Sequence, residues 1–431
     1  MKRLLIAAFL VQPFMASSQE LNIGDTLPEL QLCNVINHSS DTIRLSEYKG
    51  KLLILDFWAT NCSGCLASFP KIDSLQKKFS DKLQFVLVTK QTADQLNNFF
   101  TRRKWIQLPH VPVITGDTTL SSLLPYFGMP FHVWIDKTGR ILFKLSSPST
   151  NDLSLAKYLS GQELELTPYT NHRFFVEPYV NTRYVEKLIS SSILAKCRFG
   201  NPKSYPPEAM SSLVSLGCKC LSVPQLYKSA YNEGKNKFFY SYQLDVRVID
   251  SAKHFQPEKL IDPGKWYLEN TYNYELLIPK QRKSDLYKIF QSELQKNFGW
   301  KANVEWRAFN GWALVKIFPF QFKTTKGPQV DSFYRTAGLN KIESPVRFVR
   351  NMPFSFFSAR LQNWIQLEHK VPFRDETGID SNVDISLPGP VIESLDITLL
   401  KRELNKLGLD LVPRKIEAEV LCLEEAAEFQ F

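Results

Sequence analysis

Two cysteines at C-x-x-C spacing close the segment Asp56-Phe57-Trp58-Ala59-Thr60-Asn61-Cys62-Ser63-Gly64-Cys65. The run from Lys51 to Trp58 has the apolar character and the length of a central buried strand. From Leu66 onward the apolar residues recur with helical spacing, so we expect a helix there. Cys62 is therefore expected at a helix N-terminus, where unpaired N–H groups and the helix dipole favour a thiolate over a thiol.

The C-x-x-C spacing alone is ambiguous, because zinc sites use it too. Zinc needs four ligands, and the sequence has no second pair at suitable spacing and no histidine cluster. We therefore expect redox chemistry with no metal and no other cofactor. Cys65, one helical turn after Cys62, can close the redox-active disulfide.

Several positions around the two cysteines match one family of proteins. They are Asp56, Trp58, Pro70 and the pair Met129-Pro130, which precedes an apolar strand at 131–136. At these residues the chain resembles the thioredoxin superfamily, and within it the TlpA/ResA-like thiol–disulfide oxidoreductases of the bacterial cell envelope. The resemblance covers roughly residues 20–166. Asn61 departs from it, because the family usually has Trp before the first cysteine.

The resemblance implies a role for each matching residue. Asp56 would be the buried proton acceptor for Cys65, and Trp58 would pack beside the site. Pro130 would be a cis-proline that places the preceding backbone against the active-site sulfur. Trp58, Met129 and Pro130 are accordingly our candidate substrate-binding residues, and Cys62, Cys65 and Asp56 are our candidate catalytic residues.

The first 18 residues are typical of a secretory signal peptide. Lys2-Arg3 is followed by an apolar run from Leu4 to Met15 and then by small residues up to Ser18. The run is shorter than the roughly twenty residues that span a bilayer. We expect cleavage after Ser18 and a mature protein that is soluble in the periplasm or cell envelope.

Length and composition indicate a globular chain with more than one domain. It has 431 residues, of which 44% are hydrophobic. The net charge is +10, but the basic residues are scattered and form no recognisable nucleic-acid motif. Nucleic acid is therefore not an expected partner.

Residues 19–166 predict an α/β thioredoxin-like fold, with a mixed central sheet and helices on both faces. Its strands are expected at 51–58, 83–89, 110–114, 131–136 and 140–145, and its helices from Leu66 and at 93–104, 121–127 and 151–159. Residues 167–210 are interrupted by prolines and predict a connector with one helix at 181–196.

Residues 211–431 predict a duplicated α+β domain, with copies at about 211–322 and 340–431. Each copy reads as helix, strand, helix and two strands, the last two ending near Ile317 and Leu423. The segments 375–380 and 407–413 resemble an uncharacterised bacterial domain, best known from soil bacteria. That resemblance implies no activity, so we expect this half to contact a protein partner.

Five cysteines lie outside the C-x-x-C pair. For one or both of Cys218 and Cys220 we favour structural disulfides with Cys197 or Cys422, and a second redox centre is the alternative. Cys33, in the first expected strand, is interpreted as a small buried hydrophobic residue.

These observations together predict an envelope thiol–disulfide oxidoreductase. Cys62 would attack a substrate disulfide, and Cys65 would resolve the mixed disulfide with help from Asp56. The resemblance favours a reductant of protein disulfides, which would need a membrane electron donor. The alternative is a partner-binding envelope protein with a thioredoxin-like scaffold and a static disulfide.

Overall fold

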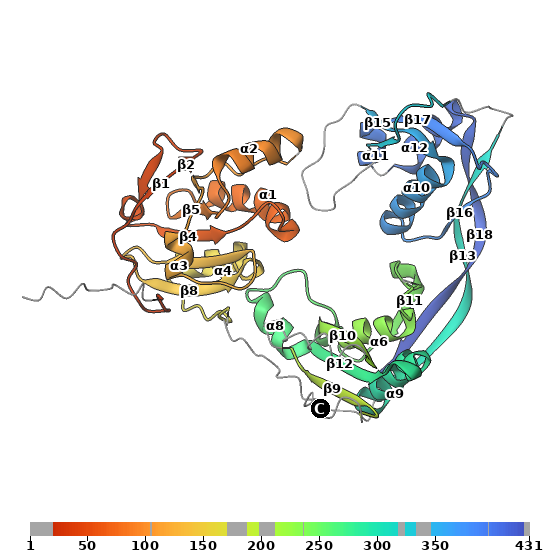
Figure 1. The fold of residues 1–431 in the computed structure, drawn as a ribbon, viewed down its shortest axis with the longest axis horizontal. Helices are drawn as coiled ribbons and strands as arrows, with labels where there is room; N and C mark the ends of the chain where they lie inside the picture. The colour runs from red at the N-terminus through yellow and green to blue at the C-terminus, as the bar shows by residue number, and fades with distance from the viewer. Residues whose placement is uncertain are drawn as a thin grey trace, which may run out of the picture. The chain divides into compact units, whose positions relative to one another are not determined.

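A computed structural model describes residues 20–103, 106–169, 188–197, 212–235, 237–317, 324–332, 346–394 and 396–425. The expected signal peptide and most of the expected connector lie outside these ranges. The chain forms two compact units that divide between Tyr169 and Thr170 (Figure 1). Among the described residues, no helix combines the length and the apolar character needed to cross a bilayer.

The N-terminal unit is built on a six-stranded sheet in the order β2-β6-β5-β4-β7-β8. β4 runs parallel to β5 and antiparallel to β7, so the sheet is mixed, as expected. The strands are β2 Val35–Ile36, β4 Leu52–Phe57, β5 Leu83–Val88, β6 Val113–Ile114, β7 Phe131–Ile135 and β8 Ile141–Ser146. A separate pair joins β1 Gln31–Cys33 to β3 Thr42–Arg44.

The helices of this unit are α1 Ser63–Lys78, α2 Ala93–Arg102, α3 Thr119–Leu123 and α4 Asp152–Leu159, with single 3-10 turns at Leu45–Tyr48 and Ser147–Ser149. Three of them begin at side-chain caps: Cys62 caps α1, Thr92 caps α2 and Asn151 caps α4. The order of strands and helices confirms the thioredoxin-like fold of the N-terminal region.

Strand β4 has all six residues buried, and successive residues face opposite sides of the sheet. Leu53, Leu55 and Phe57 join an apolar cluster that includes Leu120 and Leu124 from the α3 region. Asp56 therefore faces the opposite side, which α1 and α4 cover. This alternation places the carboxylate of Asp56 in the interior, near the helix that starts at the cysteines.

The C-terminal unit contains two successive sets of strands and helices. The first set is β10 Leu213–Leu221, α6 Val223–Asn232, β11 Leu244–Arg247, α7 Ser251–His254, α8 Pro263–Asn270, β12 Tyr272–Pro279, α9 Leu286–Phe298 and β13 Lys301–Lys316. The second set is β15 Val346–Pro353, α10 Phe354–Glu368, β16 Phe373–Asp375, β17 Asn382–Pro388, α11 Gly389–Ser394, α12 Ile397–Lys406 and β18 Leu409–Glu424. Two further strands, β9 Ser191–Lys196 and β14 Val330–Asp331, pair at the edges of β12 and β15.

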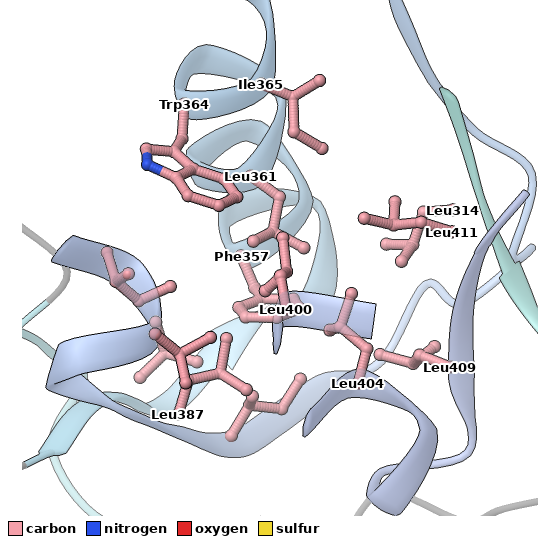
Figure 2. Packing of buried hydrophobic residues seen from close by; sticks show 14 of the residues in the cluster. Leu314, Phe357, Leu361, Trp364, Ile365, Leu387, Leu400, Leu404, Leu409 and Leu411 are labelled. Atoms are coloured by element: carbon pink, nitrogen blue, oxygen red, sulfur yellow. The ribbon is translucent and has the colours of Figure 1, made fainter. Parts of the chain in front are cut away.

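The long strands β13 and β18 pair antiparallel along their whole length (Figure 1). β11 pairs parallel to β18, and β16 pairs parallel to β13. One apolar core forms around α6 and α9, and a second forms around α10 and α12. Figure 2 shows this second core, to which α10 contributes Phe357, Leu361 and Trp364 and α12 contributes Leu400 and Leu404.

Three expectations need correction. The helix expected at 181–196 is a strand over Ser191–Lys196, because these residues pair with β12, and 181–187 lie outside the described residues. The two strands expected at the end of each copy are one strand of 16 residues. Cys33 is exposed because burial alternates along β1 and the neighbouring Leu32 takes the inward position.

Gly311 lies in the middle of β13, where the strand passes close to the backbone at Pro372. A Cβ atom at this position would lie 2.3 Å from the carbonyl oxygen of Pro372, so only glycine fits. The same carbonyl accepts a hydrogen bond from the N–H of Trp312 at 3.0 Å. The glycine thus permits a close approach of backbones instead of a chain reversal.

Candidate active site

Cys62 and Cys65 are joined in a disulfide at the start of α1. Cys62 is the N-cap residue, and the N–H of Cys65 points at its Sγ atom at 3.1 Å. Cys62 is partly exposed, whereas Cys65 is completely buried. After reduction, the N–H group and the helix dipole would stabilise a thiolate on Cys62, which is the sulfur that a substrate can reach.

The loop before Cys62 is held by a residue that sequence reasoning missed. The side chain of Gln91 accepts a hydrogen bond from the N–H of Thr60 at 2.7 Å and donates one to its hydroxyl at 2.8 Å. Gln91 lies beyond the end of β5, at the same sheet edge as the end of β4. No motif marks it, because a glutamine in a loop has many possible partners.

The Met129–Pro130 peptide bond is cis, as the resemblance implied. The Cδ atom of Pro130 lies 3.7 Å from the position that a Cβ atom of Gly64 would occupy, so the proline contacts the loop between the cysteines. Met129 is 37% exposed. Pro130 therefore lies beside the loop between the cysteines, and Met129, the residue before it, is exposed.

The ring of Trp58 lies inside the fold, which differs from the substrate contact that the sequence suggested. It is 1% exposed and packs edge-on against Phe69 at 5.0 Å, with Phe100 at 6.4 Å. Apolar side chains on α1 and α2 pack against the ring and stabilise this buried position. The Trp58 side chain thus packs in the interior against the helix that carries the two cysteines.

Asp56 is buried on the α1 side of the sheet, with 1% of its side chain exposed. Its Oδ1 atom lies 3.4 Å from Nε2 of His132, which is 2% exposed. Burial lowers the pKa of Lys71 on α1 to about 8, while the charge of Asp56 acts in the opposite direction. Sequence reasoning missed His132 and Lys71. The signal for His132 was its place two residues after Pro130, on the strand that pairs with β4.

A second disulfide joins Cys197 to Cys220 in the C-terminal unit. Both residues lie at strands that flank β12, so the bond links the two edges of one sheet. Burial raises the pKa of the remaining Cys218 thiol, although Ser229 opposes the shift. Cys218 is therefore poorly suited to act as a thiolate at neutral pH.

The comparisons with known proteins fall on the N-terminal unit. The model of the AhpC/TSA family matches residues 23–164. The chain is 25% identical over 161 residues to the thiol-disulfide oxidoreductase ResA of Bacillus cereus, which covers 37% of this chain and 87% of ResA. It is 35% identical over 81 residues to the thioredoxin-like protein YneN of Bacillus subtilis, and this match spans 18% of the chain and less than half, 46%, of YneN.

Solved structures match the same part of the chain. A putative thiol:disulfide interchange protein DsbE from Chlorobium tepidum is 25% identical, with 33% of this chain and 98% of that chain covered and a TM-score of 0.28. The pneumococcal lipoprotein thioredoxin Etrx1 is 28% identical, covers 28% and 89% of the two chains, and has a TM-score of 0.25. The N-terminal unit is thus a thioredoxin-like domain of the kind found in ResA-like thiol–disulfide oxidoreductases.

Proposed function

We propose that this protein is a thiol–disulfide oxidoreductase of the periplasm or cell envelope that reduces protein disulfides. The observation that carries the proposal is the asymmetry of the two sulfurs. Cys62 is partly exposed and is the N-cap residue of α1. Cys65 is buried, and it lies on the same helix as Lys71, whose charge interacts with that of buried Asp56. One sulfur is placed to meet a substrate and the other to act only afterwards.

The reaction proceeds in two exchanges. The Cys62 thiolate attacks one sulfur of the substrate disulfide, that bond breaks, and the second substrate sulfur leaves as a thiolate that takes a proton from solvent. Cys65 then gives its proton to Asp56 and attacks Sγ of Cys62. The mixed disulfide breaks, the second substrate sulfur leaves as a thiolate that takes up a proton from solvent as Asp56 releases its own, and the protein is oxidised by two electrons.

The location and the direction of this reaction belong to the proposal. The signal-like residues 1–18 support export, and the relatives named ResA support a protein thiol or disulfide as substrate. The loop residues Ser63 and Gly64 carry no charge, which favours a reductant over a strong oxidant. Each turnover leaves the disulfide behind, so a membrane electron donor must restore the dithiol.

We infer that the C-terminal unit arose by duplication and recruits a protein partner. Each set begins with a strand and a helix, continues with two strands, and ends with a helix and a 16-residue strand, although α7 and α8 separate β11 from β12 in the first set and α11 precedes α12 in the second. The pairing of β11 with β18 and of β16 with β13 is symmetric about the β13–β18 pair. Most of the aromatic residues of α10 are core, because Phe354 and Phe357 are fully buried and Trp364 is 8% exposed.

The reduction potential of Cys62–Cys65 tests the enzymatic proposal. The full chain is equilibrated in glutathione buffers and alkylated, and the peptide 52–71, which holds both cysteines, is quantified by mass spectrometry. We expect a potential above about −300 mV and turnover of insulin disulfides. A lower potential without turnover would instead establish the static disulfide of a partner-binding scaffold.

A further inference from the structure

His132 and Asp56 form a buried pair whose carboxylate interacts electrostatically with Lys71 of α1. They lie opposite each other in the register of β4 and β7, with Nε2 and Oδ1 3.4 Å apart. Neither side chain makes a hydrogen bond within the part of the chain that the structure describes. His132 also follows Pro130 by two residues, so one short strand links the pair to the substrate-facing loop.

The burial of both groups limits how they can hold protons. An isolated charge in the interior is costly, so the cheapest states of the pair are net neutral. These states are an ionised carboxylate beside an imidazolium, or a carboxylic acid beside a neutral imidazole. In either state the two side chains share one dissociable proton, which can move over a short distance.

The surroundings of His132 contain few other titratable groups. β4 contributes Asp56, and α1, the helix that also carries Cys65, contributes Lys71, whose charge acts on Asp56. The neighbouring strands contribute apolar side chains, namely Phe85 on β5 with ring centres 6.3 Å apart and Leu145 on β8 opposite in register. Tyr158 on α4 is the next titratable group along this face, beyond the ring of Trp134.

We propose that His132 is a positioning residue for the resolving step, which orients Asp56 and shares the proton that Asp56 takes from Cys65. This inference rests on the proposed function. When the Cys65 S–H bond breaks, the proton goes to Asp56, and the sulfur keeps the electron pair and attacks Cys62. His132 stabilises Asp56 in the ionised form that accepts the proton, and once the Cys65 sulfur has attacked Cys62 the pair releases that proton to solvent and returns to its net neutral state. The first exchange at Cys62 does not involve the pair.

The experiment follows the two exchanges separately in the full chain. Reduced protein is mixed with 5,5′-dithiobis(2-nitrobenzoate), quenched with acid at intervals and alkylated, and the peptide 52–71 is analysed by mass spectrometry. The mass of this peptide distinguishes the dithiol, the mixed disulfide on Cys62 and the closed disulfide. His132→Gln keeps a hydrogen-bond donor but cannot titrate. We expect it to slow closure at neutral pH by at least about tenfold, to remove one inflection from its pH profile, and to leave the first exchange unchanged.

His110→Gln is the matched control. His110 also lies 3.3 Å from an aspartate, Asp73, but its side chain is 86% exposed. This control should leave both steps unchanged. In an Asp56→Asn background His132→Gln should change closure by less than about twofold, because the two residues act as a unit.

Three outcomes would overturn the inference. They are an unchanged pH profile in His132→Gln, equal slowing of both exchanges, or full additivity with Asp56→Asn. If the wild-type protein forms no mixed disulfide, the proposed function itself fails, which separates the two results. If His132→Gln does not fold, the role is tested instead in the wild-type protein by side-chain ¹⁵N NMR of His132, with the ring signals assigned through the backbone. Ring shifts that are identical in the reduced and oxidised protein would then refute the role.

Discussion

Lys71 offers a quantitative test of the charge balance beneath the active site. Burial lowers its pKa from 10.5 to about 8, and its Nζ donates to the carbonyl oxygen of Ser147 at 3.3 Å. Between these two pKa values the unfolded chain binds more protons than the folded one, so the free energy of unfolding rises with pH. Below about pH 8 both states are protonated, and the cost of burying the charge is constant at about 3 kcal/mol.

We therefore compare the pH dependence of stability in the wild type and in Lys71→Met. From about pH 7 to about pH 9.5 the wild type should gain about 2 kcal/mol relative to the variant, because Lys71 loses its proton in the folded state first. Urea denaturation of the oxidised full chain, followed by fluorescence, measures the difference at the two pH values. Packing changes caused by the methionine cancel, because they change the free energy of unfolding equally at the two pH values.

Lys78→Met is the control for this comparison. Lys78 lies on the same helix and pairs with Asp152 at 2.7 Å, but its side chain is 55% exposed. Its substitution should leave the pH dependence unchanged. Equal pH slopes in the wild type and in Lys71→Met would refute our account of a buried, destabilising cation next to Asp56.

Three further outcomes are expected. Brief iodoacetamide treatment of reduced protein near neutral pH should label Cys62 at least about tenfold faster than Cys65, read by mass spectrometry, and preferential labelling of Cys65 would reverse the assigned roles. Asp56→Asn should slow closure of the mixed disulfide by about 100-fold while leaving its formation unchanged, and identical closure rates from about pH 6 to about pH 9 would contradict the role of this carboxylate. Gly311→Ala should destabilise the C-terminal unit by about 1–3 kcal/mol in thermal denaturation, because its Cβ atom would meet a backbone carbonyl, whereas Gly217→Ala, with open space around it, should cost less.

The sequence was most informative where local pattern and tertiary structure agree. The apolar run at β4, the helical spacing after Cys65 and the proline after Met129 each restrict the backbone on their own, and all three lie where we expected them. Residues 191–196 are different. Their short apolar pattern suits a helix or an edge strand equally, and only the pairing with β12, about eighty positions further along the chain, decides between them.

The residues that sequence reasoning missed share a physical cause. Lys71 looks like one more polar position on an amphipathic helix, and His132 looks like a polar interruption of an apolar strand. Their effect depends on burial and on distance to Asp56, and both are set by the register of β4 against β7 and by the docking of α1. A one-residue shift in that register would turn His132 to the opposite face of the sheet, where Leu55 and Phe57 of β4 lie. The chemistry of the His132–Asp56 pair therefore depends on strand register as much as on residue type. For this reason, an experiment on His132 also tests how the fold controls the proposed resolving thiol of Cys65.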